Sequence, residues 1–356
     1  MNRNRELPNA SFVRGALPIS CVMCQQGAKM VLLVTGKCAH DCWYCPLSLE
    51  KKGRDVTYAD ELLVKSDEDV IFEAKAIGAR GTGITGGDPL LVADRTAHYI
   101  RLLKDEFGAR HNIHIYTATP DAEKIGKLAD AGLNEIRFHP HPDTWISPDP
   151  EYGNAIRAAL DCGLRAGIEI PAIPDHVDHM RYLARTMYDA GAEFINLNEL
   201  EFSESNWQQL MEKGFEVRDD VTSAVLGSEE AALRLVEELE NDMIIHYCSS
   251  SFKDATQLRN RLMRRAKNTA TGLEIITDEA TFLKGVVETD EPEKFVRELR
   301  RKFAIPAGLI RHDVRKSRVE IAAWVLEELA SEISGVKYLV WEYPTADRLE
   351  VERQPL

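Results

Sequence analysis

Residues 38–45 read Cys-Ala-His-Asp-Cys-Trp-Tyr-Cys, which places Cys38, Cys42 and Cys45 at a C-x3-C-x2-C spacing. Iron–sulfur clusters are held by cysteine thiolates, and each iron of a [4Fe–4S] cluster needs a ligand. Three local cysteines leave one iron without a protein ligand and open to a bound molecule. Core cysteines do not gather at this density, and structural zinc sites usually have two separated ligand pairs. The stretch therefore predicts a [4Fe–4S] cluster with one open iron.

The composition is that of a soluble globular chain of 356 residues with 44% hydrophobic content. No apolar run reaches the roughly 18 residues of a membrane helix, so no membrane partner is predicted. The basic N-terminus lacks the apolar core of a secretory signal. Five of the seven cysteines lie within residues 21–45, which does not resemble a disulfide framework. We therefore expect a reducing, cytoplasmic location in which the thiolates can bind metal.

The charge is unevenly distributed along the chain. Its net charge is −14, yet residues 251–318 hold 16 Lys and Arg against 10 Asp and Glu. A basic segment on an acidic chain can bind nucleic acid, although a solvated helix face gives the same pattern.

Between residues 30 and 198, apolar runs alternate with amphipathic segments. The pattern predicts strands over 30–36, 80–85, 112–117, 133–138, 164–170 and 193–198, and helices over 67–78, 93–107, 121–131, 151–162 and 177–190. Six βα units in a row imply a parallel sheet covered by helices. Periodicity alone does not separate an open doubly wound sheet from a partial barrel. In both, ligand sites lie at the C-terminal ends of the strands, where the cysteine loop follows the first strand.

The flanking regions carry weaker patterns. Residues 1–20 are polar and are expected to be irregular, and 199–228 form a longer excursion. A helix over 229–240, a strand over 243–248 and a basic helix over 253–269 follow. The remainder predicts a small C-terminal α/β sandwich with strands over 273–288, 308–319 and 336–343 and helices over 292–303 and 320–333. The expected domains are thus an N-terminal arm (1–29), the main body (30–270) and the C-terminal domain (271–356).

The cysteine motif, with aromatic Tyr44 before its last cysteine and a hydrophobic strand before its first, resembles that of the radical S-adenosylmethionine (SAM) superfamily. The continuation to Pro46 looks most like proteins related to the pyruvate formate-lyase activating enzyme. This resemblance implies a partial (β/α)6 barrel of the radical SAM type. It also implies that the loop cysteines, Cys38, Cys42 and Cys45, hold the cluster, that SAM chelates the fourth iron, and that Tyr44 lies against the adenine.

The second predicted strand ends in Thr85-Gly86-Gly87-Asp88-Pro89. Two glycines at a strand end allow close approach of a ligand to the backbone, although a tight turn needs them equally. The element resembles the Gly-Gly-Glu-Pro sequence of the radical SAM family, with Asp88 in place of Glu. The resemblance implies that Gly86, Gly87 and Asp88 bind the methionine amino group.

Later strands offer four further candidates for SAM binding: Arg137, Glu169, Asn196 and Asn198. An arginine suits a carboxylate through its bidentate fork, and ribose and adenine need paired donors and acceptors. Each position could instead be a polar residue that faces solvent or substrate. His139 and His141 could form a metal pair, but a rigid proline-rich turn is the commoner meaning of such a sequence.

A second cysteine pair, Cys21 and Cys24, precedes the first strand. With His246 and Cys248 it would complete a Cys3His set, which suits zinc. A second iron–sulfur cluster or no metal at all are the alternatives. The geometry poses an objection, because Cys24 precedes the first strand and could lie at the opposite end of the barrel from Cys248. The site requires an antiparallel last strand or a folded-back N-terminal arm.

In the mechanism that the resemblance implies, a donor such as ferredoxin or flavodoxin reduces the cluster. SAM is then cleaved reductively to methionine and a 5′-deoxyadenosyl radical, which abstracts hydrogen from a substrate. The substrate is a protein glycine if the chain is a glycyl-radical activase, RNA if the basic segment binds tRNA, or a small cofactor precursor. A non-catalytic iron–sulfur protein is the alternative from another class.

Overall fold

The structure is a computed structural model that describes residues 4–147, 150–219, 221–239 and 242–356. The first three residues of the predicted arm and residue 240 of the predicted helix 229–240 lie outside the described residues. The chain divides into two compact units. The first comprises residues 1–74 and 79–258, and the second comprises residues 75–78 and 259–356.

The first unit is built on one open sheet with the order β1-β2-β11-β10-β9-β8-β7-β6-β3-β4-β5. Its centre is parallel throughout, from β11 to β3. These parallel strands are β3 (Lys29–Leu33), β6 (Gly81–Thr85), β7 (Asn112–Thr117), β8 (Glu135–Phe138), β9 (Arg165–Ala172), β10 (Phe194–Glu199) and β11 (Ile244–Cys248). Antiparallel strands flank them: β1 (Asn4–Glu6) and β2 (Phe12–Arg14) on one side, β4 (Tyr58–Ala59) and β5 (Leu62–Leu63) on the other. The sheet does not close, so the predicted partial barrel is confirmed.

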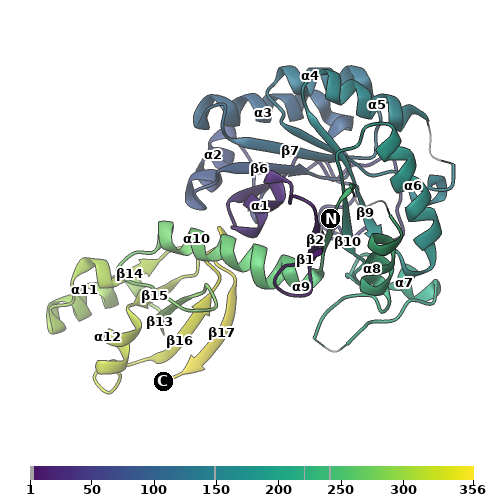
Figure 1. Cartoon of the computed structure of the whole chain (residues 1–356). Coiled ribbons are helices and arrows are strands. Elements are labelled where there is room, and N and C mark those ends of the chain that lie inside the picture. The colour runs from purple at the N-terminus through teal and green to yellow at the C-terminus, as the bar shows by residue number, and fades with distance from the viewer. Residues whose placement is uncertain (1–3, 148–149, 220, 240–241) are drawn as a thin grey trace. The chain divides into compact units, whose positions relative to one another are not determined.

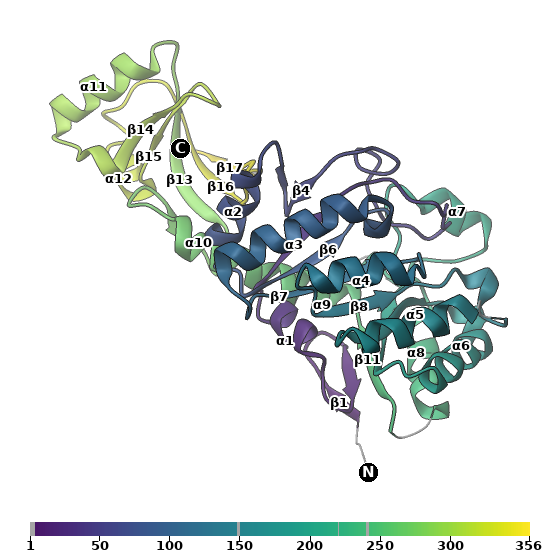
Figure 2. The ribbon, with the colours of Figure 1, turned by 90° about the horizontal axis from the view of Figure 1, so that it is seen from above.

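Amphipathic helices cover the outer face of this curved sheet (Figures 1 and 2). They are α2 (Asp67–Ala76), α3 (Ala93–Phe107), α4 (Ala122–Asp130), α5 (Pro150–Asp161), α6 (Val177–Asp189) and α8 (Ser228–Glu238). In α3, Ala97, Ile100 and Leu103 are fully buried at helical spacing, which fixes the helix on the sheet. Asp121 caps α4 by accepting a hydrogen bond from the Lys124 backbone. The six predicted βα units are therefore present, each within a few residues of its expected bounds.

The predicted irregular structure of residues 1–20 is wrong for the described residues, which begin at residue 4. Strands β1 and β2 form a hairpin, and β2 pairs antiparallel with β11. Arg14, which is buried, donates to backbone carbonyls of Val236, Leu239 and Met243. Helix α1 (Ile19–Gln25) follows and packs on β3, β6 and β7, on the concave side of the sheet (Figure 1). The pairing of β2 with β11 joins residues more than 200 positions apart in the sequence, so no local pattern reveals it.

The second unit is a two-layer α/β structure. Its sheet has the order β14-β15-β13-β16-β17, with β12 (Ile275–Ile276) paired to β13. The strands are β13 (Phe282–Glu288), β14 (Ile310–Asp313), β15 (Arg318–Ile321), β16 (Val336–Glu342) and β17 (Glu350–Pro355). Helices α11 (Pro292–Phe303) and α12 (Ala323–Glu328) cover one face, where Leu299, Ile321 and Leu326 form part of the core.

Several details of the C-terminal prediction differ from the structure. The strand expected over 273–288 is two paired strands, β12 and β13, and the helix expected over 320–333 is the shorter α12. The single strand expected over 308–319 is the hairpin β14–β15, because Asp313 accepts hydrogen bonds from the backbone of Arg315 and Lys316 in a turn. Strand β17 was not predicted. Helix α10 (Arg259–Thr269) belongs to the second unit rather than to the barrel, and the division therefore falls at 258/259 instead of 270/271.

Candidate functional site

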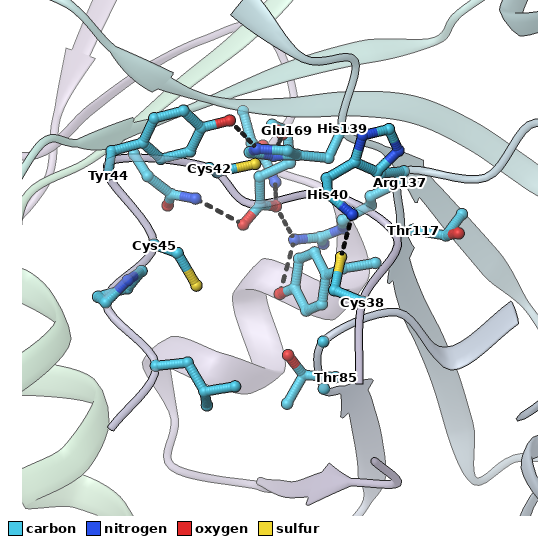
Figure 3. A pocket seen from close by; sticks show the side chains of 18 of the residues that line it. Cys38, His40, Cys42, Tyr44, Cys45, Thr85, Thr117, Arg137, His139 and Glu169 are labelled. Atoms are coloured by element: carbon cyan, nitrogen blue, oxygen red, sulfur yellow. Dashed lines mark hydrogen bonds and ion pairs between the residues drawn. The ribbon is translucent and has the colours of Figure 1, made fainter. Parts of the chain in front are cut away.

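The three loop cysteines lie on the loop that follows the C-terminal end of β3. All three line one cavity of about 630 Å³ (Figure 3). All three are free thiols, with Cys38 exposed and the other two half-buried. A volume of this size falls within the range of about 300–1,000 Å³ found for sites that hold drug-sized ligands. The predicted grouping of Cys38, Cys42 and Cys45 at the active edge of the sheet is thus present as geometry.

Residues of the segment between β10 and α8 donate hydrogen bonds to the cysteine loop. The buried Asn206 amide donates to the carbonyl of Tyr44 at 3.0 Å, and the Ser205 hydroxyl donates to that of Cys45, also at 3.0 Å. Trp43 stacks on Phe215 with ring centroids 5.7 Å apart. Sequence reasoning missed these contacts, because Ser205 and Asn206 carry no motif and lie about 160 residues from their partners.

Gly86 and Gly87 lie at the end of β6, where they line the cavity and touch the start of the cysteine loop. Gly87 N–H donates to the carbonyl of Thr35 at 2.7 Å. A Cβ atom would meet the Thr35 oxygen at 2.4 Å if placed on Gly86, and the Lys37 oxygen at 2.1 Å if placed on Gly87. Both glycines are therefore required by the close approach of the two backbones, whatever they bind.

Asp88 has partners other than the predicted one. Its carboxylate, which is fully buried, accepts hydrogen bonds from the Leu90 and Ala118 backbone and from the Thr117 and Thr119 hydroxyls, at 2.6–3.2 Å. The residue is not part of the cavity lining described above. The carboxylate thus ties the end of β6 to the end of β7, and its part in binding the methionine amino group stays a prediction.

One wall of the cavity is a buried charged network, which we call the cavity cluster (Glu135, Arg137 and Glu169). Arg137 lies 2.6 Å from Glu135 and 2.7 Å from Glu169. Glu169 also accepts from the amides of Asn196 and Asn198, each at 2.8 Å. Burial alone would raise the pKa of Glu169, but these donors and the guanidinium hold it below its usual value. The structure thus brings Arg137, Glu169, Asn196 and Asn198 together as lining residues.

Tyr44 is joined to this wall through His139. The Tyr44 hydroxyl lies 2.7 Å from Nε2, and Nδ1 lies 2.7 Å from the carbonyl of Glu169 (Figure 3). Burial lowers the pKa of His139, which favours the neutral ring. Because a carbonyl only accepts, Nδ1 carries the proton and Nε2 accepts from the Tyr44 hydroxyl. Both ring nitrogens are therefore engaged, which leaves His139 no free nitrogen for a metal pair with His141.

The second cysteine set comes together at the same cavity. Cys21 and Cys24 on α1, and His246 and Cys248 on β11, all line it. The N-terminal arm does fold back, as the geometric objection required. Burial raises the pKa of the Cys21 thiol to about 12, against the opposing effect of Arg137. Whether these residues hold a metal stays a prediction.

Tyr116 is a lining residue that sequence reasoning missed. Its hydroxyl lies 3.3 Å from Arg137 Nη1 and 2.9 Å from His114 Nε2. His114 in turn meets the buried Lys29 ammonium at Nδ1, 3.0 Å away. The alternation of polar residues along 112–117 was the available signal, because residues two apart on a strand share one face.

Comparison with known proteins identifies the family of this chain. The sequence profile of the radical SAM superfamily matches residues 32–145, and that of a domain of unknown function, DUF8061, matches residues 280–356. A protein of Methanocaldococcus jannaschii, provisionally named a glycyl-radical enzyme activating enzyme, is 40% identical over 353 residues, which cover 96% of this chain and 93% of that protein. The chain therefore belongs to the radical SAM superfamily and is an enzyme. SAM and a [4Fe–4S] cluster are the cofactors of this superfamily.

Two solved structures are more distantly similar. Methylornithine synthase (PylB) is 16% identical, with a TM-score of 0.43 over 61% of this chain and 63% of its own. HydG, a maturase of the [FeFe]-hydrogenase, is 13% identical, with a TM-score of 0.42 over 69% and 65%. In the part of the chain that the structure describes, no helix is long and apolar enough to cross a membrane.

Proposed function

We propose that this chain is a glycyl-radical activase, which installs a radical on a backbone glycine of a partner protein. The observation that carries the proposal is its 40% identity, along nearly the whole chain, to a relative provisionally named an activating enzyme. The Cys-Trp-Tyr-Cys-Pro stretch, which resembles proteins related to the pyruvate formate-lyase activating enzyme, supports it independently.

The residues at the cavity fit the cofactors of the superfamily. Three free thiols can ligate three irons of a cluster and leave the fourth to SAM. The side-chain oxygen of Asn196 is buried in the cavity wall and has no hydrogen-bond partner. A buried acceptor without a donor is costly, and the hydroxyl or amino groups of SAM would satisfy it. When bound, the reduced cluster and SAM supply a 5′-deoxyadenosyl radical for hydrogen abstraction.

The protein's own part is to bind, orient and exclude water. We assign Cys38, Cys42 and Cys45 to the cluster, and the backbone at Gly86 and Gly87 to the methionine end of SAM. The Asp88 carboxylate fixes that backbone. Arg137 and Glu169 form a rigid wall with the two asparagine amides, and Tyr44 is the candidate for the adenine. The glycine Cα–H of the partner must reach the same cavity.

The structure gives less support to RNA, the alternative substrate. That idea rested on the basic helix over 253–267 and on the Lys- and Arg-bearing domain that follows it. Lys253 pairs with Glu201 at 2.9 Å, and the Arg259, Arg264 and Arg265 guanidinium groups donate to backbone carbonyls. These four side chains are therefore engaged within the fold, which lessens the support that the basic helix gives to RNA binding.

The test combines the reconstituted chain with an unactivated glycyl-radical enzyme, SAM and a reductant under anaerobic conditions. We expect 5′-deoxyadenosine in the product mixture and a glycyl radical on the partner, seen by electron paramagnetic resonance. Cys42→Ala should remove both signals. Cys162→Ala, at an exposed cysteine outside the cavity, should match the wild type.

Two outcomes separate the class from the substrate. If 5′-deoxyadenosine forms but deuterium enters it only from a small metabolite, the activase proposal fails while the superfamily assignment stands. If tRNA binds with a steep salt dependence and gains a modified nucleoside, the RNA alternative replaces it.

A further inference from the structure

The cavity holds a second set of thiols that the proposed chemistry does not use. Cys21 and Cys24 lie three residues apart on α1, so both can point to the same side of the helix. His246 and Cys248 lie two residues apart on β11, which places them on one face of the strand. The β1–β2 hairpin brings α1 back across the sheet, and all four residues line the same cavity. We call Cys21, Cys24 and Cys248 the inner cysteines.

His246 is the strongest sign that this set has a ligand. The residue is 2% exposed, and neither ring nitrogen has a hydrogen-bond partner. Its described ring neighbour is Phe252, with centroids 6.5 Å apart, which offers an apolar surface and no acceptor. Buried polar groups in native proteins are nearly always bonded, and an imidazole nitrogen is a common metal ligand. The other members of the set supply thiols in the same cavity.

Two of the sulfur atoms accept hydrogen bonds of the kind that stabilise a thiolate once it binds metal. Cys21 Sγ accepts from the Arg137 guanidinium at 3.3 Å and from the Asn196 amide at 3.6 Å. Cys248 Sγ accepts from the Gln257 amide at 3.4 Å. Hydrogen bonds from N–H groups to ligating sulfur are the usual outer contacts of metal–thiolate sites, and the guanidinium offsets negative charge there.

We propose that Cys21, Cys24, Cys248 and His246 hold a second thiophilic metal centre, either zinc or an iron–sulfur cluster, separate from the cluster of the loop cysteines. As the side chains stand, no three His, Cys, Asp or Glu residues in the described ranges form a single-ion site, and this is equally true of Cys38, Cys42 and Cys45. Thiol rotamers therefore change when metal binds at either place. The proposal does not depend on the activase function.

The experiment compares two triple variants of the full chain, each reconstituted anaerobically with iron and sulfide, supplied with zinc and desalted. The loop variant is Cys38→Ala/Cys42→Ala/Cys45→Ala, and the inner variant is Cys21→Ala/Cys24→Ala/Cys248→Ala. We expect the loop variant to retain either about one zinc or an iron–sulfur complement per chain. The inner variant should lose that metal and keep about four irons. Cys162→Ala is the matched control and should equal the wild type.

The identity of the retained metal decides between zinc and an iron–sulfur cluster. Zinc without sulfide indicates a single ion, whereas iron with matching sulfide indicates a cluster. A loop variant that holds less than about a tenth of one metal per chain, or an inner variant with the full wild-type metal content, overturns the proposal.

A folding failure of the inner variant leaves a second measurement. The loop variant is titrated with Co²⁺ alone, and we expect sulfur-to-cobalt charge-transfer absorption at a stoichiometry of about one. Adding His246→Ala to the loop variant should weaken Co²⁺ binding at least tenfold. Absence of the absorption in the folded loop variant overturns the proposal.

Discussion

Two buried clusters in this chain are built alike, each with a basic side chain between two glutamates. In the cavity cluster, Arg137 lies 2.6 and 2.7 Å from Glu135 and Glu169. In the second unit, Lys284 lies 2.6 Å from both Glu320 and Glu342, and we call these three the sheet cluster. Every side chain in both clusters is at most 11% exposed.

The remaining partners of the glutamates distinguish the two clusters. Glu320 and Glu342 turn to further cations, Arg311, Lys316 and Arg318, so their charge is balanced within one sheet. Glu169 turns to two neutral amides, Asn196 and Asn198, on a wall that a cavity leaves open. A buried ion pair alone is thus weak evidence of a site. Neutral donors placed around a cavity are the more informative feature.

The largest expected effect is on the rate of SAM cleavage, which should depend on the cavity cluster and not on the sheet cluster. Arg137→Met leaves two facing carboxylates without their cation and disturbs the amides beside them. We expect the rate of 5′-deoxyadenosine formation with dithionite to fall at least about 100-fold, or ~2.7 kcal/mol. Lys284→Met should keep the rate within about twofold at temperatures where circular dichroism shows a folded chain. Equal losses in both variants would erase the distinction.

On stability, the sheet cluster should lose part of its charge balance when one partner is removed. Lys284→Met takes away the ammonium group that Glu320 and Glu342 share, while Arg311, Lys316 and Arg318 remain, so we expect a loss of about 1–3 kcal/mol in the unfolding free energy of the second unit. Hydrogen exchange of the β13 and β15 peptides measures it. Arg165→Met, which breaks a half-exposed pair with Glu193, is the control and should cost less than about 1 kcal/mol. A loss as small as the control's would show that the sheet cluster is not needed for stability.

The sheet cluster also predicts a pH dependence. Burial opposes the charge of Glu320, but Lys284, Arg318 and Arg311 together lower its pKa from 4.5 to about 2. A depressed carboxyl pKa contributes stability that is fully present above the unfolded value and is lost as the pH falls through the folded value. Between pH 5 and pH 2, Glu320 should therefore account for a loss of about 3 kcal/mol in the second unit. In Glu320→Gln this part of the slope should vanish in the same exchange measurement; an unchanged slope would assign it to other groups.

The sequence predicts some parts of this site better than others. The loop cysteines and the Gly86-Gly87-Asp88 stretch are contiguous and adjoin strong strand signals, and their place at the sheet edge follows from parallel topology. The cavity cluster was available only as separate polar residues on successive strands. Their convergence depends on register, with Asn196 opposite Glu169 and Arg137 opposite Gly167.

The features that could not be predicted depend on contacts distant in sequence. The return of α1 to the cavity rests on the antiparallel pairing of β2 with β11. The anchoring of the cysteine loop rests on Asn206 and Ser205, polar residues in an irregular segment. The role of Asp88 was obscured by its motif, because only the buried donors around it show that its carboxylate is used within the fold.

The smallest expected effect concerns the link between the cavity cluster and the cysteine loop, for which the sheet cluster has no equivalent. Tyr44→Phe removes the hydroxyl that donates to His139 Nε2 and leaves that buried acceptor unpaired. A neutral hydrogen bond contributes about 1 kcal/mol, so the dissociation constant of SAM should rise about fivefold if the loop must be held against the wall. Tyr182→Phe, at an exposed tyrosine on α6, is the control in equilibrium dialysis of the reconstituted enzyme. An unchanged SAM affinity with a lowered unfolding free energy would mean that Tyr44 and His139 stabilise the loop without shaping the cofactor site, so that the cavity cluster would act on SAM only through the residues that line the cavity directly.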